Sequence, residues 1–520
     1  MDAEPASLFW GEKTEEVRME NRPQFGSRIG FIMAAAGSAI GLGNIWRFPA
    51  VAYENGGGAM FIPYLVALMT AGIPLLIMEI AIGHKHRASP PVAFGRMRRG
   101  FVPLGWWHVI VTFFITMYYS TVIAWALSYV WFSLNLGWGD KPEAFFHGYL
   151  QLADAPGQIG GLVPGVVIPL AIVWLGVLIV VHRGVKKGIE RAAKIMMPML
   201  CVLFAVLVVR ALTLEGAAEG LNAFFKPNWD MIRDSKVWVA AYTQIFFSLS
   251  LAHAIMICYG SYLDRKEDVA GNAFIVGFAN SGFELLAGIG VFAALGFMAV
   301  QQGVGVHDVV SGGTGLAFVA FPQIINQLPA LNELFGVLFF MSLVLAGVTS
   351  MIGQVESIVQ GLQEKFRITR GMAVLFGGGL TMLASLLFAT RDGRHLVNVV
   401  DYFVNSYGVT LIGLAEVIAV AWIAKRLREL QDHINAVSGI RIGAWWRTCL
   451  GIITPFVLGY MAIDSIRANL VETYGGYDAW FVGVFGWGAA AAALAISVIF
   501  AAIPDRKPEI RTAESAEVSS

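Results

Sequence analysis

The sequence has 520 residues, of which 57% are hydrophobic and only 14% are charged, and its mean hydropathy is +0.66. A soluble domain carries about 25% charged residues, so this composition excludes a chain whose whole surface faces water. It indicates a lipid bilayer as a partner. The formal net charge is +0, which argues against nucleic acid as a partner.

Apolar runs long enough to cross a bilayer, which takes about 20 residues, recur from residue 28 to residue 503. The predicted fold class is an all-α integral membrane protein with one transmembrane domain at 28–503. An N-terminal segment, 1–27, precedes it and a tail, 504–520, follows it. We expect twelve membrane-spanning helices, at 28–52, 58–83, 104–136, 163–182, 189–213, 237–263, 270–301, 332–363, 371–391, 396–424, 444–464 and 478–503.

Lysine and arginine concentrate in alternate loops of this pattern, and such residues mark the cytoplasmic side of a membrane protein. The loop at 84–103 carries Lys85, Arg87, Arg96, Arg98 and Arg99, whereas the next loop, at 137–162, carries Lys141 alone. With an even number of spans, both termini are expected to face the cytoplasm. The short outer loops lead us to expect a multi-pass protein of the bacterial inner membrane.

Two of the expected spans carry residues that disfavour an uninterrupted helix. In the span 28–52 they are Gly37, Gly41, Gly43 and Pro49, and in the span 237–263 polar residues stand at mid-depth, namely Ser248, Ser250 and His253. A broken helix is tolerated in lipid only where its freed backbone lines a cavity or is buried in protein. The alternative is that the glycines only pack against neighbouring helices.

The two interrupted spans stand five helices apart, which predicts a pair of inverted repeats. The first repeat would cover about 28–213 and the second about 237–424, with two extra helices in 444–503. Such an arrangement places a binding site near the bilayer midplane.

Several motifs resemble those of the neurotransmitter:sodium symporters, whose bacterial members include a leucine transporter. They are SRIGFIMAAAGSAIGLGNIWRFPAVAYENGGGAMFIPY at 27–64, GIPLLIMEIAIG at 72–83, QIFFSLSL at 244–251 and AGVTS at 346–350. The resemblance runs in order over the first ten expected helices. It implies sodium-coupled import of a small amino acid, or of an amino-acid-like zwitterion, by alternating access.

The resemblance also implies two bound sodium ions. The first would be held, together with the substrate's carboxylate, by oxygen atoms of Ala39, Asn44, Ser248 and Asn280. The second would be held by carbonyls and hydroxyls of Gly37, Ile40, Ala346, Thr349 and Ser350. For the two hydroxyls, ordinary hydrogen bonding to the preceding helical turn is the alternative.

For the substrate, the resemblance implies contacts to both ends of a zwitterion. The carboxylate would meet the amides of Leu42 and Gly43 and the hydroxyl of Tyr119. The amino group would meet Ala39, Phe247, Ser248 and Ser250. Gly41 stands where monoamine carriers of the family have an aspartate, which favours a substrate that carries a carboxylate.

The side-chain pocket implied by the resemblance would be lined by Ile115, Tyr119, Phe247, His253, Ser350 and Gln354. An unpaired polar group at mid-membrane costs about 1–3 kcal/mol, so the polar His253 and Gln354 favour a substrate with a polar side chain. Alternatively, these two side chains bond each other, the backbone or water.

Glu284 lies four residues after Asn280 and therefore on the same helical face. Chloride-dependent relatives have a serine at this position and bind chloride there, whereas chloride-independent bacterial members have a glutamate. The resemblance thus implies that Glu284 supplies the fixed negative charge near the first sodium ion, with Tyr64, Gln244 and Ser248 around it, and that no chloride is needed. Protonation of Glu284 when sodium leaves would give proton counter-transport. A purely structural carboxylate is the alternative.

The resemblance further implies two gates that close one side at a time. The outer gate would pair Arg47 with Asp401, assisted by Gln244, and the inner gate would pair Arg22 with Glu364. The alternative is that they are surface ion pairs worth about 0–1 kcal/mol.

A substrate-gated ion channel, or a non-transporting amino-acid receptor of the same fold, is the alternative function. A channel would need a continuous polar pore, and the sequence contains no filter-like repeat. An enzyme is not expected, because HExxH, GxSxG and P-loop motifs are absent. We expect a monomer or a weak homodimer.

Overall fold

The computed structural model describes residues 23–504, and throughout this range the regular structure is helical. Ten helical segments are long and apolar enough to cross a membrane. They are Gly58–His86, Arg99–Ser133, Pro164–His182, Val185–Leu212, Val269–Gln302, Asn332–Phe366, Arg370–Ala389, Gly393–Ile423, Ala444–Gly476 and Ala479–Ala502. The predicted all-α membrane fold is confirmed.

At the places of the other two predicted spans, the helices are interrupted. At the first, α2 (Arg28–Ala39) and α3 (Leu42–Glu54) meet at a bend of 54° and together satisfy the same length and hydropathy test. At the sixth, α12 (Ser235–Ser248) and α13 (Ile255–Gly260) are each too short to count as a span. The interruptions that the sequence predicts are therefore confirmed, whereas the count of twelve spans is not.

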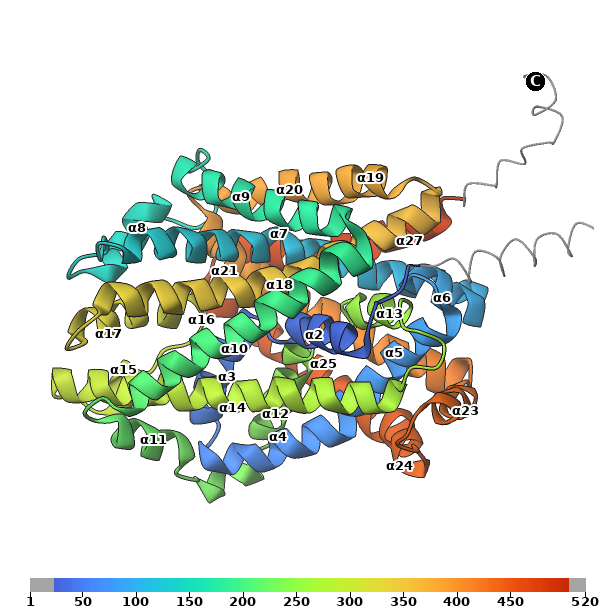
Figure 1. Ribbon diagram of the computed structural model, residues 1–520, viewed down its shortest axis with the longest axis horizontal. Coiled ribbons are helices and arrows are strands. Elements are labelled where there is room, and N and C mark those ends of the chain that lie inside the picture. Colours follow the sequence, from blue (N-terminus) through green and yellow to red (C-terminus); the bar gives the residue numbers. More distant parts are fainter. Residues whose placement is uncertain (1–22, 505–520) are drawn as a thin grey trace, which may run out of the picture.

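The long helices run side by side, and short loop helices gather at the two ends of the bundle (Figure 1). At one end lie α8 (Pro142–Leu150), α11 (Ala217–Phe225), α15 (Val306–Val309) and α17 (Phe321–Gln327). At the other end lie α6 (Pro90–Met97) and α23 (Leu427–Val437). The segments next to α6 and α23 are rich in lysine and arginine, so these positive loops share one end of the bundle.

Burial divides the helices into an inner and an outer set. The inner helices are α5 (Ile73–His86), α7 (Val102–Ser133), α14 (Val269–Gln302) and α18 (Asn332–Phe366), which belong to spans that are 72–83% buried. The outer helices include α9 (Pro164–His182), α10 (Arg191–Leu212) and α27 (Gly488–Ala502), in spans that are 22–39% buried. The outer set therefore presents the surface that suits lipid.

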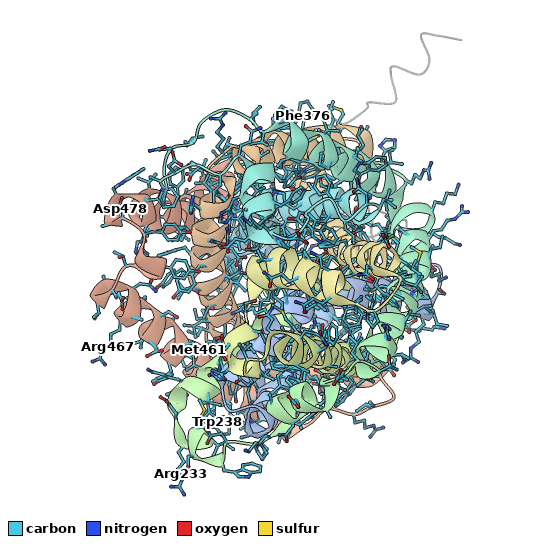
Figure 2. All side chains as sticks on the ribbon, turned by 90° about the vertical axis from the view of Figure 1, so that its left-hand side faces the viewer. Arg233, Trp238, Phe376, Met461, Arg467 and Asp478 are labelled. Atoms are coloured by element: carbon cyan, nitrogen blue, oxygen red, sulfur yellow. The ribbon has the colours of Figure 1, made fainter. Side chains whose placement is uncertain are left out.

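A view along the bundle places Phe376 at its rim, with Arg467 and Asp478 at the edge formed by the last helices (Figure 2). Phe376 is 58% exposed, which fits an apolar side chain in contact with lipid rather than water. The two broken helices contain mostly buried residues and belong to the interior of the bundle.

The first break lies between α2 and α3, where Ile40 and Gly41 adopt extended backbone conformations. The Asn44 side chain accepts a hydrogen bond from the Gly41 amide at 2.9 Å and thereby caps the start of α3. The start of α2, at the opposite end from the break, is also capped by a side chain, because the Ser27 hydroxyl accepts from the Gly30 amide. Local capping thus accounts for the break.

The second break is longer, and it covers residues 249–254 between α12 and α13. Ser250, Ala252 and Ala254 have φ values of +50°, +61° and +61°. Left-handed conformations cost residues with a side chain about 1–2 kcal/mol each. Contacts from other helices must therefore stabilise the non-helical conformation of this segment.

Candidate functional site

The two breaks meet at the carbonyl of Ser38, near the end of α2. This oxygen accepts a hydrogen bond from the Ser250 hydroxyl, in the second break, at 3.0 Å. It also accepts one from the Ser350 hydroxyl, on α18, at 3.0 Å. All three residues are buried. The structure thus brings both interrupted helices and α18 to one point.

Around this point, three of the residues predicted for the first sodium ion form a hydrogen-bonded chain. The Asn44 side chain donates to Asn280 Oδ1 at 2.8 Å, and Asn280 Nδ2 donates to the Ser248 hydroxyl at 3.0 Å. The three side chains come from α3, α14 and α12. Ala39, the fourth predicted residue, ends α2 and is 3% exposed. A cluster of neutral oxygen atoms of this kind suits a small hard cation.

The residues predicted for the second sodium ion lie where α2 packs against α18. The Thr349 hydroxyl donates to the carbonyls of Leu345 at 2.9 Å and Ala346 at 3.0 Å, which is the ordinary bond to the preceding turn. A Cβ atom added at Gly37 would lie 3.2 Å from the Thr349 Cβ, so these two residues touch. Ile40 follows α2 directly and is buried.

The residues predicted to bind a carboxylate lie at the start of α3. The Leu42 amide donates to the Tyr119 hydroxyl, which comes from α7, at 3.2 Å. A Cβ atom at Gly41 would lie 2.8 Å from this hydroxyl, and a Cβ atom at Gly43 would lie 2.4 Å from the Phe247 ring. Glycine at both positions therefore lets two aromatic side chains approach the helix terminus.

His253 and Gln354 take different partners in the predicted side-chain pocket, to which Ile115 and Tyr119 also belong. His253 Nδ1 lies 2.6 Å from the Leu251 carbonyl. Gln354 Oε1 is buried and has no hydrogen-bond partner among the described residues. Within that part of the chain the two side chains do not bond each other.

Glu284 is fully buried on α14, one helical turn beyond Asn280. The Tyr64 hydroxyl donates to one of its carboxylate oxygens. Gln244 Nε2 donates to the other at 2.6 Å. Tyr64 and Gln244, two predicted neighbours of this carboxylate, therefore contact both of its oxygens.

At the predicted outer gate, no ion pair within 4.0 Å joins Arg47 to Asp401 in the described part of the chain. The Arg47 guanidinium instead lies over the Phe247 ring, 4.6 Å from its centroid. Asp401 Oδ1 accepts from Asn405 Nδ2 at 2.9 Å, and the same nitrogen donates to the Tyr118 hydroxyl at 3.0 Å. Asn405 and Tyr118 are partners of this carboxylate that the sequence did not reveal.

At the predicted inner gate, Arg22 lies outside the described residues. Glu364 Oε2 accepts from the amide and the hydroxyl of Ser89, at 2.8 and 2.6 Å.

Glu79, on α5, contacts the second break and was not among the predicted sodium, substrate or gate residues. The amide of Ala252, in the second break, donates to Glu79 Oε1 at 2.7 Å. The sequence signal was a carboxylate within the apolar span 58–83. An ionisable residue within a membrane span usually has a functional or structural partner.

A family model described as the Sodium:neurotransmitter symporter family matches residues 22–147 and 140–505. An uncharacterized sodium-dependent transporter of Methanocaldococcus jannaschii is 40% identical over 479 residues, which cover 92% of this chain and 97% of that protein. The sodium- and chloride-dependent taurine transporter of Bos taurus is 30% identical over 531 residues, with 92% and 83% covered. The human sodium- and chloride-dependent GABA transporter 2 is 30% identical over 529 residues, with 92% and 85% covered.

Proposed function

Because the chain belongs to the sodium:neurotransmitter symporter family, we propose that it imports a small amino acid, or an amino-acid-like zwitterion, with sodium by alternating access. Its relatives are sodium-dependent solute transporters and not enzymes. The observation that carries the proposal is the pair of helix breaks, which meet beside the Asn44–Asn280–Ser248 chain.

Two sodium ions are proposed for the oxygen atoms around the breaks. At the first position, the side chains of Asn44 and Asn280 would exchange their mutual hydrogen bond for a shared cation. At the second, Thr349 and Ser350 would turn from backbone carbonyls towards an ion. At the second position, the Thr349 hydroxyl already lies 3.0 Å from the Ala346 carbonyl, a proposed ligand of the same ion.

A carboxylate-bearing substrate is favoured by the geometry at the start of α3. Amides at a helix N-terminus attract anions, and the Leu42 amide faces the Tyr119 hydroxyl with no acidic side chain between them. If the substrate's carboxylate also ligates the first sodium ion, each ligand raises the affinity for the other. Sodium and substrate would then bind as a coupled pair.

A polar substituent on the substrate is favoured by the Gln354 oxygen, which has no hydrogen-bond partner within residues 23–504. A substrate donor that reaches this oxygen would recover about 1–3 kcal/mol of buried polar desolvation. Two of the three relatives named above are named as transporters of taurine or GABA, which are small zwitterions. We therefore propose a small, polar zwitterion rather than a large apolar amino acid.

Chloride independence is proposed for this transporter, although relatives are named as chloride-dependent. The fixed charge of Glu284 would replace the anion, held in place by Tyr64 and Gln244. Uptake should persist when gluconate replaces chloride, and Glu284→Ser should make uptake depend on chloride. Equal loss of uptake in gluconate for both proteins would contradict this role. Proton counter-transport through Glu284 is part of the same proposal.

The gates and the membrane orientation complete the proposal. Arg47 and Asp401 would close the outer side by approaching each other over Phe247, and Arg22 with Glu364 would close the inner side. Both termini would face the cytoplasm of a bacterial cell, in its inner membrane, and the protein would act as a monomer or weak homodimer.

The deciding experiment is a thermal-shift screen of the purified protein against amino acids, amines, betaines and taurine, in sodium and in potassium. We expect one class of small zwitterion to raise the melting temperature in sodium alone. A substrate that stabilises the protein equally in potassium would contradict sodium coupling. Steady conduction without substrate in proteoliposomes would favour a channel instead.

A further inference from the structure

An open hollow of about 310 Å³ lies at the end of the bundle that holds α6 and α23 (Figure 1). The last turn of α5, the last turn of α6 and the first turn of α23 line it. The lining contains three basic side chains, namely Lys85, Arg96 and Arg426. None of them is a proposed sodium, substrate or gate residue, so the proposed transport cycle gives the hollow no role.

Basic side chains outnumber acidic ones in the hollow. Glu429 is the acidic residue among the described residues that line it, and it accepts hydrogen bonds from Lys85 and Arg426. These two bonds lower the pKa of Glu429, so this side chain is negatively charged at neutral pH. Three positive charges thus surround one negative charge, and the hollow keeps a surplus of positive charge even when His86 is neutral.

The hydrogen bonds inside the hollow orient the basic groups and use only part of the donor capacity of Lys85 and Arg426. A lysine ammonium has three N–H donors and a guanidinium has five. Glu429 accepts one bond from each of these two side chains, and the His86 carbonyl accepts one from Arg96. The first turn of α23, which follows Arg426, adds the positive end of a helix dipole. Guanidinium groups bind phosphate oxygens in a bidentate manner, so this donor set suits a phosphate group.

The hollow lies just beyond the ends of two membrane spans. The span Gly58–His86 ends within its lining, and the span Gly393–Ile423 ends shortly before Arg426. Trp422, in the last turn of the second span, is 48% exposed. Tryptophan is enriched where a membrane meets water, and the polar headgroups of lipids lie in the same layer. The hollow is therefore at the depth of a phospholipid phosphate.

We propose that Lys85, Arg96 and Arg426 form a binding site for the phosphate group of an anionic phospholipid. Basic pockets between membrane helices bind anionic headgroups in this way. The surplus positive charge favours a headgroup with a net negative charge over a zwitterionic one, whose cation the same side chains repel. Because its ligands come from α5, α6 and α23, a bound headgroup would connect the loop at 84–103 with α23. The site does not depend on sodium coupling.

Native mass spectrometry of the purified protein, titrated in detergent with phosphatidylglycerol or with phosphatidylcholine, tests the preference for an anionic headgroup. The wild type should bind phosphatidylglycerol several-fold more tightly than phosphatidylcholine. Arg96→Gln and Arg426→Gln should each lower the ratio of the two affinities by about 5-fold. This ratio is insensitive to a general loss of stability. The matched control is Arg428→Gln, because Arg428 is exposed on the same helix and does not line the hollow.

The control variant should keep the wild-type ratio. An equal fall of the ratio in all three variants would show a general attraction to surface charge and would overturn the site, as would an unchanged ratio in both variants of the hollow.

A second titration distinguishes a lipid headgroup from free phosphate. Phosphatidylglycerol should raise the melting temperature of the wild type but not that of Arg426→Gln, and inorganic phosphate at the same concentration should leave both unchanged. An equal rise with inorganic phosphate that disappears in Arg426→Gln would overturn the assignment to a lipid.

Discussion

The two helix breaks differ in how the chain produces them. The break between α2 and α3 is two residues long, and a glycine with an asparagine cap accounts for it locally. The break between α12 and α13 is six residues long and contains Ser250, Ala252 and Ala254 in left-handed conformations. Its shape depends on bonds to Ser38, Glu79 and Thr112 on other helices.

The first break is therefore determined by its own residues, whereas the second is stabilised by contacts with other helices. The first break resists change because its own residues disfavour a helix there. The second stores about 1–2 kcal/mol of backbone strain at each left-handed residue, and it keeps its shape only while its contacts last. The second break is therefore the better candidate for the part that moves during transport.

The largest expected effect is that of Asn44→Ala, which removes the cap of the first break and a proposed sodium ligand. Sodium-dependent substrate affinity should fall by about 100-fold or more, which corresponds to about 3 kcal/mol. Radioligand binding to the purified protein measures this. The matched control is Asn55→Ala, at the opposite end of α3, where the side chain bonds only the Val51 carbonyl. Equal affinity in Asn44→Ala and wild type would exclude Asn44 as a ligand.

Gly43→Ala should have the next largest effect, because its added Cβ atom overlaps the Phe247 ring. Its Cβ atom would lie 2.4 Å from the Phe247 ring, so the ring or the start of α3 must shift. Overpacking of this kind costs about 1–3 kcal/mol, which corresponds to a loss of about 5- to 150-fold in substrate affinity if the whole cost falls on binding. Gly282→Ala, whose Cβ would meet nothing within 4 Å, is the control. The steric account fails if both variants bind substrate equally well.

Ser250→Ala and Ser350→Ala test the shared contact at the Ser38 carbonyl. Each should lower affinity by a few-fold, in line with about 0.5–1.5 kcal/mol per hydrogen bond. The double variant should lose more than the sum, because the buried carbonyl is then left without these partners. Ser342→Ala, which removes a bond within α18 only, serves as the comparison. Additive losses would show that the two hydroxyls act independently.

Ala252→Gly should have the smallest effect, and it should be stabilising. Glycine adopts the left-handed conformation at no steric cost, so relief of strain outweighs the added backbone entropy by about 0.5–1 kcal/mol. Ala241→Gly, within α12, should destabilise by a similar amount. Melting temperatures of the two variants measure the difference. The same sign of change in both would show that the second break is not strained.

Much of the fold could be predicted because its signals are local. Apolar length located the spans, and helices such as Pro164–His182 begin and end close to the predicted 163–182. Glycines and Asn44 located the first break. By contrast, the segment Ala444–Gly476 runs beyond the predicted end at 464, because its last turns are exposed and polar residues there do not stop a helix.

The partners within the site depend on tertiary contacts and were harder to predict. Ala252 and Ala254 favour helices, so nothing local reveals their left-handed conformations. The hydrogen bond that the Ala252 amide donates to Glu79 forms only in the folded structure. The bond from Asn405 to Asp401, one helical turn earlier, is local, whereas the bond from Asn405 to the Tyr118 hydroxyl on α7 forms only in the folded structure. Main-chain acceptors such as the Ser38 carbonyl cannot be predicted from residue type, because every residue has a backbone carbonyl.

Binding of radioactive sodium to the purified protein, with and without the zwitterion found by the thermal-shift screen, tests the central claim most directly. If the oxygen atoms between the two breaks hold the cation, sodium should bind, its affinity should rise when the zwitterion is added, and Asn44→Ala with Asn280→Ala should abolish that rise. A sodium affinity that does not change when the zwitterion is added would contradict the account. So would a rise in sodium affinity that remains after both asparagines are replaced.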